Sequence, residues 1–528
     1  FGSRVEFAAG LADWCVVDSG TMSAPDEPED HTPAAENRRD DDADGEGEGD
    51  NESSSSEQDD AAERRRPERS RCRLLCGASV LVPVIAFFSA GPRSHVYIVK
   101  HVGPTLAQQL FGRADRVITV MQEHPGDLQL QASACQALAN LAFGNPLYRN
   151  SITKAGGIEQ VLAVMSKFQQ DAEVLVPACK ALALTTFDNK YHGARAASAG
   201  GIQHVLASMQ NHPAHGPLQA SACEVLAGFA FNNKELSSNI TRLGGVNQII
   251  SGMSAHPRHV GVSINACLAM VNLVTENVDS GVVFVQADGI PLVTQALSEH
   301  LNDAVVQSNC CLLLARLTGI NAEVKSLVVG AGAVAILAAS LRAHGKDDRA
   351  SAHAMVAVAN IAFNDLNSSN AFADAGVHHL ISEAMAKHEM EPDLQALSCA
   401  ALANMAYNNS AISAVLAAKE FVPLIVKVFH FHANNPEVQA YGCAALASLL
   451  GIHDGSGPVH KRVIAENDGV RHVVQAMRMH PRNPVVRKHA CFSLKALEGE
   501  VGAETELREN GLAGACGEIV VPPGLPTT

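Results

Sequence analysis

The sequence predicts an all-α solenoid in which copies of one helical unit stack along the chain. Three observations predict this fold class. A histidine recurs at intervals of 44 or 88 residues, at His124, His212, His256, His300, His344, His388 and His432. A cysteine column repeats with the same period. Only 4% of the 528 residues are aromatic, which suits close packing of small-residue helices better than a β fold. A fixed period of this length is typical of repeat arrays.

Residues 1–73 are expected to lie outside the array. The sequence begins at Phe1, and Met22 is a candidate start, so residues 1–21 need not be native. Between residues 26 and 70, acidic side chains outnumber arginines and contribute −12 of the net charge of −16. Such a segment is too poor in apolar residues to offset its ordering entropy, so it is predicted to be disordered. The body carries little net charge, which argues against a nucleic-acid partner.

Residues 74–95 contain an apolar run over 74–90 that is interrupted by Pro83 and preceded by basic residues. This run is at the short limit for a membrane span. One interpretation is a membrane anchor, with Cys72 and Cys76 as acylation sites. The interpretation that we favour is a degenerate helix that caps the array, because a run shorter than about 18 residues does not establish a span.

The array is expected over residues 96–499, with three helices in each unit. Apolar residues recur at helical spacing around Met121 and again around Leu138, with a polar break between them. These stretches predict a second helix of about three turns and a longer third helix. A short first helix is predicted before each pair. Residues 500–528 are expected to form a tail or a degenerate capping repeat.

A polar column is expected to open each first helix. It consists of Asn145, Asn189, Asn233, Asn277, Asn321, Asp365 and Asn409. These side chains accept hydrogen bonds from unpaired N–H groups at a helix start, so the column predicts N-caps. Glycine pairs are expected to end the short helix and turn the chain, at Gly156-Gly157, Gly200-Gly201 and Gly244-Gly245.

The cysteine column is predicted to lie in the core. Its members are Cys135, Cys179, Cys223, Cys267, Cys399 and Cys443, with Cys311 and Cys491 at the equivalent place in two further units. One cysteine per unit on an apolar stripe is typical of a small buried hydrophobe. We therefore expect reduced thiols and a cytoplasmic or nuclear protein.

The histidine column admits two interpretations. Four of its members precede a proline, which disfavours helix at the preceding residue, so His-Pro predicts the end of the second helix. A histidine there can also donate to the last carbonyls of its own helix. The alternative is a ladder of metal sites. We favour helix termination, because each gap between units would supply two ligands where a structural zinc ion needs four. No cofactor or metal is predicted.

Three helices per 44 residues, with a glycine turn after the first, resemble the armadillo repeat. Residues 131–141 (QASACQALANL) and 394–405 (LQALSCAALANM) are similar to the third helix of that family, and the resemblance covers about nine copies. It implies a right-handed superhelix whose third helices line a concave groove for extended peptides or partner proteins. HEAT repeats are the nearest alternative, but they lack the short first helix and the glycine turn.

The resemblance also points to binding residues. The position five after the cysteine column holds Asn140, Asn272, Asn360 and Asn404, with Arg316 in another unit. In armadillo proteins the matching asparagine binds the backbone of an extended peptide, and an amide offers both a donor and an acceptor. The equally weighted alternative is an asparagine that closes the end of its own helix.

The position one turn earlier holds Gln136, Lys180, Glu224, Leu268, Leu312, Val356, Ala400 and Ala444. This order predicts a groove that is polar at its N-terminal end and apolar in the middle, suited to an amphipathic partner segment. The alternative is that the apolar residues only pack between helices. Nuclear-import receptors of the family carry a tryptophan column at this turn. The one tryptophan here, Trp14, lies outside the array, which weakens that interpretation.

The expected function is non-catalytic protein binding, as a scaffold or adaptor that is monomeric. The sequence contains no phosphate-binding loop, zinc-protease motif or nucleophile elbow. Two alternatives remain open: an importin-like adaptor for basic peptides, and a structural ciliary or membrane-anchored armadillo protein.

Overall fold

The array is built from helices alone in the part of the chain that the structure describes. The computed structural model describes residues 114–407, 409–417, 421–450, 457–497, 503–512 and 515–516, and none of these residues lies in a strand. The expectations for residues 1–73 and 74–95, and for the start of the array at residue 96, lie outside the described residues. The all-α prediction is confirmed.

Helices of three kinds follow one another along the chain. The first helices are α7 (Pro146–Lys154), α10 (Lys190–Ser198), α13 (Lys234–Arg242), α16 (Val278–Gln286), α19 (Ala322–Gly330), α22 (Leu366–Asp374), α25 (Ser410–Ala417) and α28 (Gly457–Glu466). The second helices are α5 (Ala114–Glu123), α8 (Gly157–Lys167), α11 (Gly201–Asn211), α14 (Gly245–Ala255), α17 (Gly289–Glu299), α20 (Ala333–His344), α23 (Val377–Lys387), α26 (Phe421–Phe431) and α29 (Gly469–Met479).

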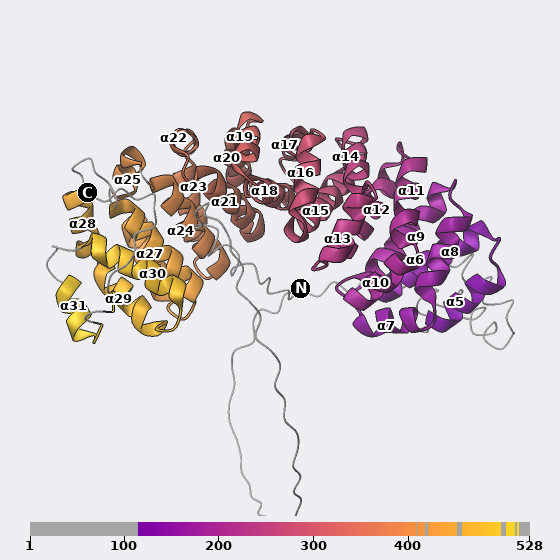
Figure 1. Cartoon of the computed structure of the whole chain (residues 1–528), viewed down its shortest axis with the longest axis horizontal. Helices are drawn as coiled ribbons and strands as arrows, with labels where there is room; N and C mark the ends of the chain where they lie inside the picture. Colours follow the sequence, from indigo (N-terminus) through magenta and orange to yellow (C-terminus); the bar gives the residue numbers. More distant parts are fainter. Residues whose placement is uncertain are drawn as a thin grey trace, which may run out of the picture. The chain divides into compact units, whose positions relative to one another are not determined.

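The third helices are the longest. They are α6 (Leu128–Ala142), α9 (Ala172–Thr186), α12 (Gly216–Ala230), α15 (Val260–Glu276), α18 (Ala304–Thr318), α21 (Asp348–Ala362), α24 (Pro392–Ala406), α27 (Pro436–Leu450) and α30 (Pro484–Ala496). Each third helix packs against the third helix of the next unit, and second helices also pack on their successors. Figure 1 shows this succession of neighbouring units from α5 to α30. The solenoid prediction is thereby confirmed.

The predicted N-cap column is confirmed. Asn145 Oδ1 accepts hydrogen bonds from the backbone N of Leu147 and Tyr148 at 3.0 and 3.3 Å. Asn321 Oδ1 likewise accepts from the backbone N of Val324 at 2.8 Å. Each polar side chain thus satisfies one or two of the N–H groups that have no partner within the helix.

The glycine turns between first and second helices are also confirmed. Gly156, Gly200 and Gly244 adopt φ values of 82°, 86° and 82°, in the left-handed region that favours glycine. The next residue is packed closely against the first helix. A Cβ atom on Gly245 would lie 2.4 Å from Ile240 Cγ2, so the side chain of the preceding helix occupies that space.

The histidines end the second helices as predicted, but their rings do not bond their own helices. Nε2 of His256 lies 2.8 Å from the carbonyl oxygen of Pro213, and Nε2 of His388 lies 3.3 Å from that of Gly345. Because a carbonyl oxygen only accepts, Nε2 carries the proton and donates. Each ring therefore joins its unit to the preceding one, through the carbonyl 43 residues earlier.

A glutamine column, which the sequence interpretation missed, bonds the last carbonyls instead. Nε2 of Gln307 donates to the carbonyl oxygens of Leu297 and His300 at 2.7 and 3.1 Å. The same pair of bonds recurs at Gln131, Gln219, Gln395 and Gln439. The glutamine satisfies carbonyls at the end of the second helix that have no partner within the helix.

The cysteine column lies in the core. Cys135, Cys223 and Cys311 are fully buried free thiols. Burial raises the pKa of Cys135 to about 12, so its thiol stays protonated and unreactive at neutral pH.

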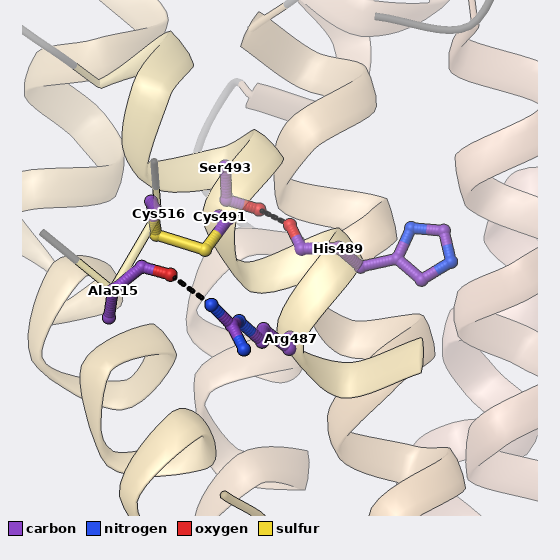
Figure 2. The surroundings of a disulfide bond; sticks show 6 residues. All are labelled: Arg487, His489, Cys491, Ser493, Ala515 and Cys516. Atoms are coloured by element: carbon purple, nitrogen blue, oxygen red, sulfur yellow. Dashed lines mark hydrogen bonds between the residues drawn. A yellow bond between two sulfur atoms is a disulfide. The ribbon is translucent and has the colours of Figure 1, made fainter. Parts of the chain in front are cut away.

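The expectation of a reduced thiol is wrong at Cys491. This residue of α30 forms a disulfide with Cys516, and the Cα atoms lie 5.3 Å apart (Figure 2). Beside the disulfide, Nη2 of Arg487 donates to the carbonyl oxygen of Ala515 at 2.8 Å (Figure 2). The helix α31 (Ala503–Glu509) packs on α29. The chain after α30 thus covers the end of the array, where no further unit follows among the described residues.

Candidate functional site

The predicted binding residues all lie on third helices. We call their surface the third-helix face, defined by Gln136, Asn140, Lys180, Glu224, Asn272, Arg316, Asn360 and Asn404. Lys180 is exposed and the others are half-buried. Because these residues occupy two repeated positions one turn apart, the stacking of third helices places them in two parallel rows.

Three asparagines of the face are held by the preceding helix. Nδ2 of Asn272, Asn360 and Asn404 donates in each case at 2.9 Å, to the carbonyl oxygens of Ala227, Ala315 and Ala359 respectively. The acceptor lies 45 residues earlier, near the end of the previous third helix. The alternative that each asparagine closes its own helix is therefore wrong for these three residues. The amide nitrogen fixes the orientation of the side chain.

The amide oxygens of these three asparagines stay available. No described residue donates a hydrogen bond to Oδ1 of Asn272, Asn360 or Asn404, and all three side chains are half-buried at the surface. Each is therefore an oriented acceptor in a repeated position. Asn140 differs, because its Oδ1 accepts from Nε2 of Gln136 at 3.1 Å.

A second row of inter-unit bonds was missed in the sequence. Nδ2 of Asn265 donates to the carbonyl oxygen of Ala220 at 2.9 Å, and Nδ2 of Asn309 to that of Ile264 at 3.2 Å. In the next unit, Nδ1 of His353 lies 3.1 Å from the carbonyl oxygen of Ser308. The partners are again 45 residues apart. The residue types vary along this row, so no single repeated residue marked it.

The charged residues of the face respond to burial. Burial raises the pKa of Glu224, and the charge of Lys180 opposes this rise. Burial lowers the pKa of Arg316. Burial, with a smaller contribution from Arg349, lowers the pKa of His353 to about 4, so His353 is neutral at pH 7.

The apolar middle of the predicted groove is not an accessible surface. The side chains of Leu312, Val356 and Ala400 are only 6%, 4% and 4% exposed. They pack between neighbouring third helices, which is the alternative that the sequence left open. The accessible middle of the face is instead polar, and it contains Arg316 and Asn360.

Membrane-spanning helices were also sought in the described part of the chain. No single helix there is both long enough and apolar enough to cross a bilayer. Only α19 and α20 meet the length and composition requirements when taken together, and a bend of 69° separates them.

The repeated three-helix unit and its caps agree with a comparison against known families. A family model described as the GAC ARM domain matches residues 225–496, which is just over half of the chain. The chain belongs to this armadillo-repeat family. Armadillo-repeat proteins are commonly scaffolds for protein interactions.

Two solved structures resemble this armadillo array. An engineered protein from the Northeast Structural Genomics Consortium aligns with a TM-score of 0.62 and 22% identity, over 79% of this chain and 98% of its own. A chain from a study in which "a conserved phosphorylation switch controls the interaction between cadherin and beta-catenin" aligns with a TM-score of 0.55 and 12% identity, over 81% and 82% of the two chains. These identities establish likeness of fold alone. No curated protein matched the sequence.

Proposed function

We propose that this armadillo protein is a non-catalytic scaffold that binds an extended segment of a partner protein along the third-helix face. The observation that carries the proposal is the set of oriented acceptors at Asn272, Asn360 and Asn404. Their amide nitrogens are held at 2.9 Å by the preceding helices. An acceptor fixed before binding loses little conformational entropy when a ligand arrives.

The spacing of these acceptors suits an extended chain. Neighbouring helices pack about 8–10 Å apart, and an extended chain advances about 3.3 Å per residue. Asn360 and Asn404 are one unit apart, so they would contact backbone N–H groups about three residues apart. Asn272 and Asn360 are two units apart and would contact groups about six residues apart.

Charged side chains would add selectivity to this backbone recognition. Arg316 lies in the unit between those of Asn272 and Asn360, and its guanidinium favours a carboxylate or carbonyl oxygen on the bound segment. Toward the N-terminal end, Lys180 and Glu224 offer charges of both signs. We expect a protein or extended peptide as partner, no nucleic acid, and a monomeric array.

We also propose a location in the cytoplasm or nucleus. This proposal is supported by the eight cysteines that are free in the described residues, because reducing compartments keep thiols unpaired. The disulfide at Cys491 is the exception to this pattern.

Site-specific photo-crosslinking in cells tests the binding proposal. A photoreactive residue in place of Leu397, which is half-buried on α24 beside the face, is expected to capture one partner segment. The same residue in place of Gln295, which is exposed on α17, should not capture it. Equal capture of that segment from both positions would refute the proposed surface.

Asparagine variants sharpen this test. Changing Asn272, Asn360 and Asn404 to alanine should abolish capture at position 397. Gln307→Ala is the matched control, because it removes two hydrogen bonds away from the face and reports on destabilisation alone. Undiminished capture by the triple variant would show that the asparagines do not bind the segment.

A further inference from the structure

Large apolar side chains are exposed at successive turns near the N-terminal end of the described array. We call this surface the aromatic edge. It consists of Phe143, Leu147, Phe187, Tyr191 and Phe231, which are 73%, 78%, 56%, 68% and 38% exposed. Each residue lies where a third helix ends or where the following first helix begins. Exposing such side chains in water is unfavourable, so a concentrated set of them indicates an interaction surface.

The members of the aromatic edge form one row. Phe143, Phe187 and Phe231 are 44 residues apart in turn, so they occupy the same place in successive units. Arg149 links the first two turns, because its Nε donates to the carbonyl oxygen of Ala142 at 3.2 Å and its Nη1 to that of Phe187 at 2.9 Å. The guanidinium carbon of Arg149 lies 5.2 Å from the centre of the Phe187 ring. The row is therefore connected by direct contacts.

A depression lies beside Phe231 on this edge. Asp188, Asn189 and Lys190 line it together with Phe229 and residues 231–233, and Gly193 and Gly228 also line it. A Cβ atom on Gly228 would meet only Thr186 Oγ1, at 3.9 Å. The missing side chain of Gly228 thus leaves room for a group from a ligand.

The charge of the same segments is positive. Residues 143–154, 187–198 and 231–242 together carry six basic and two acidic side chains, a net charge of +4. The equivalent residues of the next four units, 275–286, 319–330, 363–374 and 407–418, carry one basic and five acidic side chains, a net charge of −4. Positive charge therefore coincides with the exposed aromatic residues.

We infer that the aromatic edge is a second docking surface, which binds an acidic segment of a partner protein through large apolar anchors. Tyrosine and arginine are enriched at the centres of protein interfaces, and both occur here. The basic side chains favour an acidic ligand. The acidic N-terminal segment of this chain is a poor occupant, because residues 26–63 contain no Leu, Ile, Val, Met, Phe, Tyr or Trp. The inference is independent of binding at the third-helix face.

Selection from a display library of random peptides tests this inference. The full chain is the target, and a variant with Phe143→Ser, Phe187→Ser and Tyr191→Ser serves for counter-selection. The three side chains are exposed, so the variant should keep its fold. Enriched peptides are expected to be acidic with at least two large apolar residues. A failure to enrich peptides, or enrichment of basic ones, would overturn the inference.

Affinities of an enriched synthetic peptide provide the second readout. Binding should weaken at least tenfold in the triple serine variant, which corresponds to about 1.4 kcal/mol. It should also weaken when the salt concentration rises from about 0.05 to about 0.5 M, because salt screens the basic side chains. Gly228→Ala should weaken binding by filling the depression, and alanine favours the helix over glycine. Equal affinity for the wild-type chain and the serine variant would contradict the inference.

Three controls separate other occupants. The variant with alanine at Asn272, Asn360 and Asn404 should bind the peptide as the wild type does, and a loss there would place the peptide on the third-helix face instead. Deletion of residues 26–63 should leave the affinity unchanged, and an increase would identify that segment as the occupant. Sedimentation should show no self-association that the serine variant abolishes, since such a result would identify a second copy of the chain as the occupant.

Discussion

Single glutamine side chains close the second helices of this array. Gln307 is fully buried, and its amide nitrogen donates to two carbonyls, one in the last turn of α17 and one at His300. Without this side chain, both carbonyls would lose a buried partner, and a buried polar group without a partner is costly. The same device recurs in several units, so it is a general feature of the fold.

We predict that Gln307→Ala lowers the free energy of unfolding of the units around α18. The loss should be about 1–3 kcal/mol, the cost of leaving buried acceptors unsatisfied. Urea denaturation followed by hydrogen exchange at α17 and α18 measures it. The control is Gln129→Ala, at an exposed position of α6, which should have little effect. Equal stability of the two variants would refute the role of the glutamine column.

The buried His353 predicts lower stability in acid. Its pKa in the folded chain is about 4, whereas an unperturbed histidine titrates near 6.5. Between these values the unfolded chain binds the proton and the folded chain does not, so stability falls as the pH decreases from about 6.5 to about 4. His353→Gln should flatten this dependence, as measured by urea midpoints across that range. An unchanged slope would show that His353 does not titrate in this way.

Bonds between residues close in the sequence could be predicted, whereas bonds between units could not. Asn145 and Asn321 were identified as N-caps because a cap bonds residues two or three positions ahead. The partners of Asn360 and His256 lie 45 and 43 residues earlier. Periodicity shows that these side chains form columns, but the stacking of units decides which carbonyl each one meets. The disulfide partner of Cys491 lay outside the repeat pattern and carried no periodic signal.

The turn between first and second helices depends on a left-handed residue. Gly244 has φ of 82°, and the equivalent Asp288 has φ of 56°. Asparagine and aspartate tolerate this region better than other residues with side chains. The two solutions to the same turn provide a matched comparison within one chain.

We predict that Gly244→Ala destabilises the array by about 1–2 kcal/mol, because a Cβ atom disfavours the left-handed conformation. Asp288→Gly should keep or increase stability, because glycine adopts this conformation at no steric cost. Thermal melting of both variants measures the difference. A melting temperature for Gly244→Ala at or above that of the wild type would contradict the assigned turn.

The disulfide should hold the C-terminal cover on the last described unit. Cys516→Ser removes a cross-link to Cys491 and should destabilise residues 503–516 locally by about 2–4 kcal/mol. Hydrogen exchange by mass spectrometry should show faster exchange in α31 and unchanged exchange in α15. Chemical reduction of the wild type should reproduce the effect. Unchanged exchange in α31 after reduction would show that the cross-link contributes nothing to the cover.

Across the array, each unit contacts mainly its neighbours, so the repeat period predicted both the fold class and the order of helices. The accessible surface was harder to predict. Leu312 and Val356 were expected to line an apolar groove, but both are buried. The exposed Phe143 and Phe187 have the same period and were not noticed. Periodicity assigns residues to equivalent positions, but burial depends on how closely successive helices approach.

Binding of the partner segment captured from cells, prepared as a synthetic peptide, tests the scaffold function most directly. Its affinity for the wild-type chain should exceed its affinity for the variant with alanine at Asn272, Asn360 and Asn404 by at least tenfold, since each lost hydrogen bond contributes about 0.5–1.5 kcal/mol. The Gln307→Ala control should bind like the wild type. Equal affinities of the wild type and the triple variant would contradict recognition of an extended segment by the asparagine row.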